Sequence, residues 1–280
     1  MAAEGSTSPV AVGRLDWLAP ETLAEALALR AERGPEATVL AGGTFLGILI
    51  NEGLVEPSAL ISLGRVGQLA GTEVVDGELR LGAMTTHRAV ERSPAVRDGW
   101  PVLAQAFSLV ASPRVRNQAT VGGVLADADY ASDPPAVLEA LGARVVLRST
   151  RGERELPVRE LIVGYYETCI AEDELLVEVR VPPAPERAVY RKFRSRSSED
   201  RPCVAVAAVN GDPALRVVVG AVGDTLQELP EACALGVEAA AEIGRRYSEE
   251  IEPISDARGS AGYRRRVIAA EVRRAVEAVA

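Results

Sequence analysis

Two glycine-containing segments are the clearest candidates for binding chemistry. Residues 38–44 read TVLAGGT and residues 119–123 read ATVGG, so in each an apolar, β-branched run meets two consecutive glycines. Glycine has no Cβ, and the backbone at such a strand end can adopt positive φ and present consecutive N–H groups to a close ligand. This arrangement suits phosphate, and two such segments could hold both phosphates of a dinucleotide. The alternative is two ordinary strand ends without a ligand.

The second segment leads into a predicted helix. Asp133 is a favourable N-cap, Pro134 suits the first helical position, and Gly142 is expected to end the helix. Neither glycine segment contains the G-x-G-x-x-G of a Rossmann fold or the G-x-x-x-x-G-K-[ST] of a P-loop. The usual NAD and ATP fingerprints are therefore absent.

Composition limits the classes of function. The chain has 280 residues, 48% of them hydrophobic, which predicts a globular protein with two or more lobes. A net charge of -9 argues against a nucleic-acid or anionic membrane surface, and residues 191–196, RKFRSR, form the one basic cluster. The N-terminal residues lack a signal-peptide pattern and no apolar run approaches about 20 residues. We therefore expect a cytoplasmic protein without a membrane span.

Cysteine and histidine are too few for several kinds of site. Cys169, Cys203 and Cys233 lie more than thirty residues apart, which fits neither a disulfide framework nor a metal motif. His87 is the single histidine, so a histidine-based triad or zinc site would need another chain. The sequence predicts no metal site and no iron-sulfur cluster in this chain.

Apolar periodicity predicts three lobes of strands and helices. Asp76 and Gly77 occupy the turn of a predicted hairpin over residues 72–85. The sequence predicts a helix over 21–33 that Gly34 ends, and two helices at the C-terminal end. Predicted strands cover residues 38–41, 59–63, 143–150, 152–158, 174–182, 190–210 and 213–224. In the last helix a stripe at helical spacing is predicted to be core, namely Ile268, Val272, Ala275, Val276 and Val279.

Five segments occur in the order found in one known family. They are TVLAGGT (38–44), LRLGAMTTH (79–87), PRVRNQATVGGVLADADYASDPPAVLEALGA (113–143), YRKFRSRSSED (190–200) and DARGSAGYRRRVIAAEV (256–272). On these segments the chain resembles the FAD-binding (medium) subunit of the molybdenum hydroxylases, the family of bacterial carbon monoxide dehydrogenase and xanthine dehydrogenase.

The resemblance implies an α+β fold. Its core would be a two-subdomain FAD-binding fold of the vanillyl-alcohol oxidase (PCMH) type, followed by a C-terminal α+β domain of the CO dehydrogenase flavoprotein type. The implied boundaries are 1–63 for the first FAD-binding subdomain, 64–170 for the second, and 171–280 for the C-terminal domain.

The resemblance also implies which residues bind FAD. The glycine segments would hold the pyrophosphate, Asp133 would face the cofactor, and Leu176 and Lys192 would lie beside the isoalloxazine ring. A cation there would stabilise the negative charge of reduced flavin, although Lys192 could instead be a solvated residue at a strand edge. The implied cofactor-binding residues are Ala41, Gly42, Gly43, Thr44, Thr120, Gly122, Gly123, Asp133, Leu176 and Lys192.

Four positions depart from the family pattern or leave a choice open. Phe45 and Val124 replace small or polar residues and remove side-chain donors, but they leave the backbone donors unchanged. Tyr130 stands where many members have proline, and could stack near the flavin or simply pack. His87 lacks the surrounding motif of a covalent flavin link, so a core or hydrogen-bonding role is predicted.

The resemblance implies a function in electron transfer. An FAD-binding subunit would take electrons from a [2Fe-2S] small subunit, supplied by a molybdenum-cofactor large subunit, and pass them to an external acceptor. Such complexes are dimers of heterotrimers in the family. Two alternatives stay open: a self-sufficient flavin oxidase or reductase of the same fold, and a flavin-free structural subunit. The organic substrate and the final acceptor are not encoded in recognisable residues here.

Overall fold

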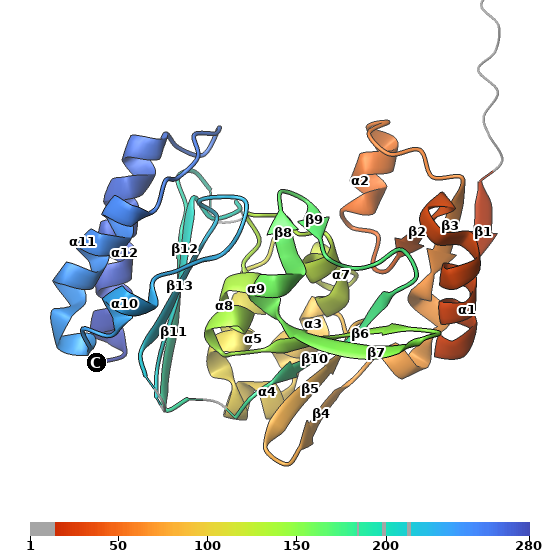
Figure 1. Cartoon of the computed structure of the whole chain (residues 1–280), viewed down its shortest axis with the longest axis horizontal. Coiled ribbons are helices and arrows are strands. Elements are labelled where there is room, and N and C mark those ends of the chain that lie inside the picture. Colours follow the sequence, from red (N-terminus) through yellow and green to blue (C-terminus); the bar gives the residue numbers. More distant parts are fainter. Residues whose placement is uncertain (1–14, 184, 198–199, 212–213) are drawn as a thin grey trace, which may run out of the picture.

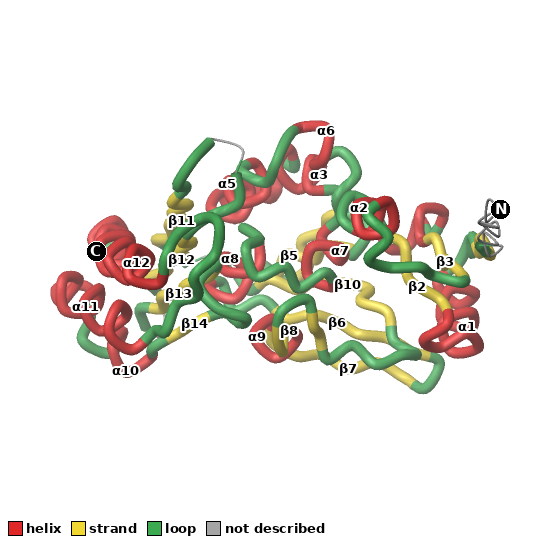
Figure 2. Tube along the Cα trace, turned by 90° about the horizontal axis from the view of Figure 1, so that it is seen from above, coloured by secondary structure: helices red, strands yellow, loops and turns green. Residues whose placement is uncertain are grey.

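The computed structural model describes residues 15–280 except 184, 198–199 and 212–213. The N-terminal stretch analysed for a signal peptide and two residues of the 190–200 segment therefore lie outside the described residues. Three parts of the chain lie in a row, with the N-terminal part at one end and the C-terminal part at the other (Figures 1 and 2). No helix among the described residues is both long and apolar enough to cross a membrane.

The N-terminal part is a small parallel sheet with a helix packed on it. Its strands lie in the order β1-β3-β2, and both pairings are parallel. Gly34 ends α1 with positive φ, as the sequence predicted. The elements are β1 (Asp16–Leu18), α1 (Leu23–Arg33), β2 (Ala37–Leu40), α2 (Leu46–Asn51) and β3 (Ala59–Ser62), with 3-10 turns at Gly34–Glu36, Leu63–Arg65 and Gly67–Leu69.

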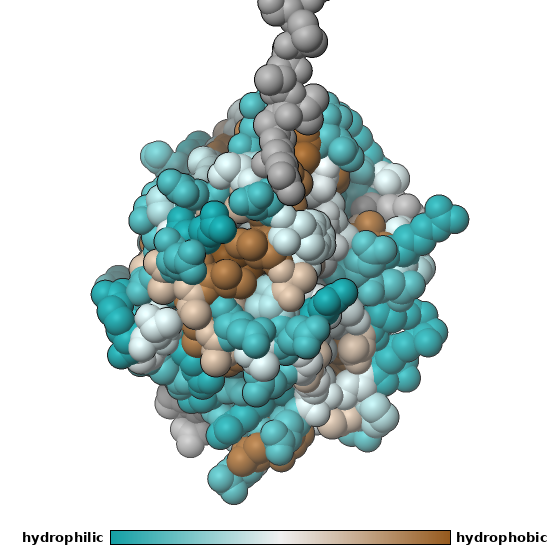
Figure 3. All heavy atoms as spheres, turned by 90° about the vertical axis from the view of Figure 1, so that its right-hand side faces the viewer, coloured by the Kyte–Doolittle hydropathy of each residue, from teal (hydrophilic) through white to brown (hydrophobic). Residues whose placement is uncertain are grey.

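The exposed end of this part is mostly hydrophilic, and apolar residues gather in a small area of it (Figure 3). Apolar side chains with large exposed fractions in the N-terminal part are Leu15, Trp17, Ile48 and Leu54. Exposed apolar residues are ordinary on the surface of a globular protein.

The middle part is an antiparallel sheet with the strand order β4-β5-β10-β6-β7. Asp76 and Gly77 both have positive φ, which confirms the predicted hairpin turn. The strands are β4 (Thr72–Val75), β5 (Glu78–Gly82), β6 (Arg144–Ser149), β7 (Gly152–Pro157) and β10 (Leu175–Val181), beside a separate hairpin of β8 (Ile162–Gly164) and β9 (Glu167–Thr168). The helices are α3 (His87–Arg92), α4 (Pro94–Gly99), α5 (Pro101–Ser108), α6 (Pro113–Arg116), α7 (Val121–Ala126), α8 (Pro134–Ala140) and α9 (Val158–Leu161).

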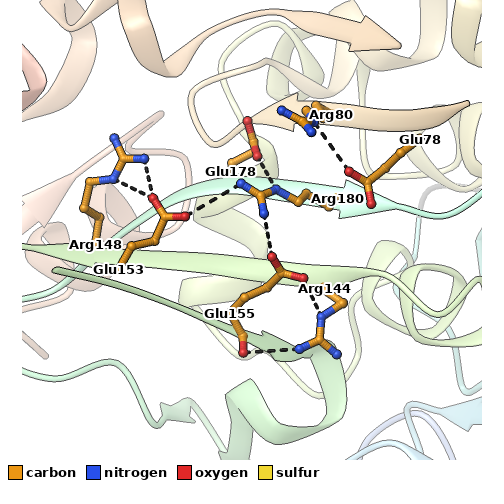
Figure 4. A network of polar contacts seen from close by, with 8 residues as sticks. All are labelled: Glu78, Arg80, Arg144, Arg148, Glu153, Glu155, Glu178 and Arg180. Atoms are coloured by element: carbon orange, nitrogen blue, oxygen red, sulfur yellow. Dashed lines mark hydrogen bonds and ion pairs between the residues drawn. The ribbon is translucent and has the colours of Figure 1, made fainter. Parts of the chain in front are cut away.

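The two faces of this sheet have different environments because successive side chains alternate. Leu79, Leu81 and Val179 belong to one face and join the helices in a common core. Charged residues of the other face form a network of ion pairs (Figure 4), in which Arg180 contacts Glu155 and Glu178 at 2.6 Å each. This network covers part of the sheet with polar groups, and each partly exposed pair contributes little stability.

The C-terminal part is an antiparallel sheet in the order β11-β12-β13-β14, covered by helices. Its strands are β11 (Arg187–Phe193), β12 (Val204–Asn210), β13 (Arg216–Gly220) and β14 (Gln227–Glu228), and its helices are α10 (Pro230–Cys233), a 3-10 turn (Val237–Ala239), α11 (Ala240–Glu250) and α12 (Ala261–Ala278). The whole predicted stripe of α12 is buried in the core between these helices and the sheet.

Three sequence predictions about elements and boundaries differ from the structure. The single strand predicted over 190–210 contains two strands, β11 and β12, which pair with each other. Residues 121–126 form α7 and not a strand that ends in a glycine turn. The strand 175–181, assigned to a C-terminal domain starting at 171, pairs with β5 and β6 in the middle sheet. A boundary at 170 would separate this strand from its sheet, since its hydrogen-bond partners lie about 30 and 100 residues earlier in the chain.

Candidate functional site

A cavity of about 600 Å³ is lined by residues from all three parts of the chain. The lining includes the loop after β2, together with α7 and the segment that follows it. Strands β10 and β11 contribute further side chains. All ten residues implied by the family resemblance line this cavity: Ala41, Gly42, Gly43, Thr44, Thr120, Gly122, Gly123, Asp133, Leu176 and Lys192.

The first glycine segment presents free backbone donors. Among the described residues, the amide groups of residues 42–45 have no hydrogen-bond partner, and Gly43 has φ +68°. Gly42 lies against the second segment so closely that a Cβ would stand 2.0 Å from the carbonyl oxygen of Gln118. Only glycine fits this contact, and the free amides that follow can accept an anionic ligand.

The second glycine segment has a different backbone conformation from the one predicted. Gly122 and Gly123 do not have positive φ, because they form the first turn of α7. Their amides are already used: Gly122 N donates to Ala83 O at 2.7 Å, and Gly123 N donates to Thr120 Oγ1 at 3.1 Å. A Cβ on Gly122 would lie 2.7 Å from the Cβ of Ala83, so this glycine allows close packing. The segment shapes the cavity wall without offering free amides in this turn.

Asp133 and Lys192 form a buried ion pair on the cavity wall. The carboxylate accepts hydrogen bonds from Lys192 Nζ at 2.8 Å and from Tyr190 Oη at 2.6 Å, and Lys192 Nζ also donates to Leu109 O at 2.9 Å. Side-chain exposure is 2% for Lys192 and 5% for Asp133. Burial raises the pKa of Asp133 and lowers the pKa of Lys192, while each charge opposes the shift of the other.

This pair corrects two readings of the sequence. Asp133 precedes Pro134 at the start of α8, but its side chain makes no capping bond because it faces β11. Lys192 is not a solvated residue at a strand edge. The resulting contact joins residues 59 positions apart and links the C-terminal part to the cavity.

Tyr130 packs against the C-terminal part, which resolves the choice left by the sequence. Its hydroxyl donates to Asp256 Oδ2 at 2.8 Å and accepts from Arg258 at 2.8 Å. Asp256 is held in turn by Arg264, a fully buried side chain, at 2.7 Å. Tyr130 is not among the cavity-lining residues. The network therefore positions the chain between α7 and α8 from outside the cavity.

Two acidic residues near the cavity were missed by the sequence analysis. Asp129 is buried and pairs with Arg201 at 2.8 Å. Asp127 lines the cavity, and its carboxylate has no hydrogen-bond or ion-pair partner among the described residues. Burial raises the pKa of Asp127 to about 7, with Asp129 adding to the shift and Arg201 opposing it. In the sequence, the only sign of these two residues was the spacing of two aspartates two positions apart.

His87 has the core role that was predicted. Its ring is 1% exposed, lies at the edge of Phe107, and places Nε2 3.1 Å from Thr120 O. The pKa of His87 is lowered to about 4, mainly by burial. The hydrogen bond to Thr120 opposes this shift, and the charge of Arg116 contributes to it. The ring is neutral at pH 7, and Nε2 donates to the carbonyl that precedes α7.

Comparison with known proteins shows to which family the chain belongs. A family model described as "FAD binding domain in molybdopterin dehydrogenase" matches residues 11–184. The nicotine 6-hydroxylase medium subunit of Paenarthrobacter nicotinovorans is 34% identical, with 86% of this chain and 89% of that protein covered. The carbon monoxide dehydrogenase medium chain of Hydrogenophaga pseudoflava is 31% identical over 95% of this chain and 96% of that one. The chain belongs to this molybdopterin dehydrogenase family.

Solved structures agree with this membership. Carbon monoxide dehydrogenase from Hydrogenophaga pseudoflava superposes with a TM-score of 0.90 at 31% identity, covering 95% of this chain and 97% of that chain. Quinoline 2-oxidoreductase from Pseudomonas putida 86 gives a TM-score of 0.89 at 29% identity, with the same coverage. The chain is thus an FAD-binding medium subunit of the molybdenum hydroxylase type, an oxidoreductase subunit with the α+β fold that the sequence predicted.

The cavity fits FAD by its donor set. Free amides at residues 42–45 suit a pyrophosphate, and the same cavity is lined by the apolar side chain of Leu176 and by the polar pair of Lys192 and Asp133. Phe45 and Val124 line the same space, so the two departures from the family pattern alter its side chains while the amides remain available.

Proposed function

We propose that this chain is the electron-transfer subunit of a molybdenum-containing hydroxylase or dehydrogenase. It would receive electrons from a [2Fe-2S] small subunit, which draws them from a molybdenum-cofactor large subunit, and pass them to an external acceptor. The assembly would be a dimer of heterotrimers in the cytoplasm. The observation that carries the proposal is the FAD-type cavity built jointly by all three parts of a medium-subunit fold.

The proposed FAD contacts differ between the two glycine segments. Residues 41–44 would surround the pyrophosphate, which the free amides of residues 42–45 would bind. Thr120, Gly122 and Gly123 would support that loop through close packing. Asp133, Leu176 and Lys192 would line the part of the cavity that takes the flavin ring.

The residues of this chain would hold and tune the cofactor. Bound FAD supplies the redox chemistry, since flavin can accept single electrons and deliver two. Lys192 would place positive charge at the cavity wall, and Asp133 would offset and orient that charge at 2.8 Å. His87 would stay neutral and keep the start of α7 in place. None of these side chains is a free base positioned for substrate oxidation.

We also propose a three-part division of the chain that follows its sheets. The first FAD-binding subdomain would run to about residue 63, and the second would include β10. The C-terminal domain would then begin with β11, so that Arg187–Phe193 is its first strand.

The proposal is tested by affinity purification of the tagged chain from its native host. We expect one larger partner with a molybdenum cofactor and one smaller partner with a [2Fe-2S] cluster. Flavin reduction by substrate should occur in the assembly and not in the isolated chain. Turnover of a substrate by the isolated, FAD-loaded chain at the rate of the assembly would instead support a self-sufficient flavoenzyme. A chain purified from the assembly without flavin would support a structural subunit.

A further inference from the structure

An aromatic contact at the FAD cavity joins the residue before α2 to the β8–β9 hairpin. Phe45, which directly precedes α2, stacks on Tyr166 in the β8–β9 hairpin with ring centroids 5.7 Å apart and an interplanar angle of 11°. Phe45 lines the cavity, while Tyr166 is 50% exposed and lies outside it. The stack therefore joins a residue of the cavity lining to an exposed residue of the neighbouring hairpin.

The α2 side of this contact is weakly anchored. None of the six residues of α2 is buried, and Ile48 exposes 54% of its surface. Gly43 and Gly53 bracket the segment with φ values of +68° and +66°, and a Cβ on Gly53 would meet no atom within 4 Å. Few buried contacts and a glycine at each end allow this segment to open locally at low cost.

The hairpin side is held more firmly. Tyr166 N donates to Ala128 O at 3.1 Å, which ties the hairpin to the chain that follows α7. Both Tyr166 and Ala128 have positive φ, a conformation that costs energy for a residue with a Cβ and persists only where the surroundings enforce it. The hairpin is therefore the fixed partner, and α2 with Phe45 is the movable one.

We propose that Phe45 and Tyr166 form an aromatic clasp that closes over the bound FAD and sets the rate of its exchange. Phe45 follows the loop whose free amides would bind the pyrophosphate, so separating the two rings opens the cavity directly beside that loop. Arg201 lies 6.0 Å above the Phe45 ring and is held by Asp129, which adds a third group to the closed arrangement. The inference rests on the FAD site proposed above.

The test is the rate of FAD release and uptake by the full chain. FAD-loaded protein is mixed with an excess of a flavin-binding apoprotein as a trap, and uptake is followed separately by quenching of flavin fluorescence. Phe45→Ala and Tyr166→Ala should each accelerate release by roughly three- to tenfold, the range expected for one aromatic pair. Uptake should also accelerate, because the opening is no longer closed. The double variant should release FAD no more than about twofold faster than the faster single variant, because both changes remove the same stack. The single changes differ only in the further contacts of Phe45 with Arg201 and of Tyr166 with Tyr130.

Two variants serve as matched controls and should keep the wild-type rates. Tyr165→Ala removes the neighbouring exposed ring, which packs on Tyr130 at 5.3 Å and not on Phe45. Tyr166→Phe keeps the ring and removes a hydroxyl that has no hydrogen-bond partner among the described residues.

Phe45→Leu replaces Phe45→Ala as the test variant if alanine at this position prevents folding.

Three results would overturn the clasp. Release within twofold of wild type in both alanine variants would show that the stack does not limit exchange. Faster release with slower uptake would show that Phe45 only supports the loop shape. Multiplied effects in the double variant would show two independent contacts. Wild-type protein that retains no FAD would instead refute the proposed FAD site.

Discussion

Replacing Lys192 by Met tests the buried ion pair on the cavity wall. The change removes two contacts of Lys192 Nζ, to Asp133 at 2.8 Å and to Leu109 O at 2.9 Å, while keeping most of the side-chain volume. Asp133 would remain 95% buried without its cation, and only Tyr190 would still donate to it. Breaking a buried pair in this way costs about 3–5 kcal/mol, and the bond from Tyr190 favours the lower end, about 3 kcal/mol.

The loss should depend on pH, because the pKa of Asp133 is already raised by burial and would rise further without Lys192. A carboxyl group whose folded-state pKa lies above its unfolded value stabilises the fold at low pH, and this contribution is lost as pH rises through the folded pKa. The Lys192→Met variant should therefore be closer to wild type at pH 5 than at pH 7.

Urea unfolding of the FAD-free chain at both pH values measures this effect without stabilisation by the cofactor. The double variant Lys192→Met with Asp133→Asn removes both charges and should recover most of the lost stability at pH 7. A loss below about 1 kcal/mol for the single variant, with no change between the two pH values, would refute the assignment of a strong buried pair.

Three other predictions follow from the same structure. Gly43→Ala should weaken FAD binding by about tenfold in fluorescence titrations, because positive φ costs an L-residue about 1–2 kcal/mol; unchanged affinity would reject the loop assignment. FAD affinity should fall between pH 6 and pH 8 as Asp127, whose pKa is raised to about 7, becomes charged beside an anionic ligand. Asp127→Asn should remove this pH dependence of FAD affinity. If the substitution leaves the pH profile unchanged, ionisation of Asp127 is not its cause. Arg264→Met should lower the free energy of unfolding by about 2 kcal/mol, because it removes the hydrogen bonds of a fully buried guanidinium to Asp256 and to Ala221 O while Asp256 keeps its pair with Arg258. Arg273→Met, at an exposed pair, should cost about 0.5 kcal/mol or less.

The sequence by itself determined features that depend on near neighbours in the chain. Asp76 and Gly77 specify the hairpin turn because their backbone preferences match positive φ, and Gly34 ends α1 for the same reason. Val272 and Val276 repeat at helical spacing and reach the core wherever the helix packs. The ordered segments also identified the family, and through it a set of residues that line one cavity.

Only the tertiary structure decided what the individual groups of that cavity can do. Gly122 looked like a donor site, but its amide is used by Ala83, a residue 39 positions earlier. Asp133 looked like a helix cap, but Lys192 and Tyr190 arrive from a distant strand and take its carboxylate. Local preference is worth about 1 kcal/mol or less at such positions, whereas a buried polar group left without a partner costs more. Long-range partners therefore override the local signal wherever a polar group is buried, and their identity follows from the fold.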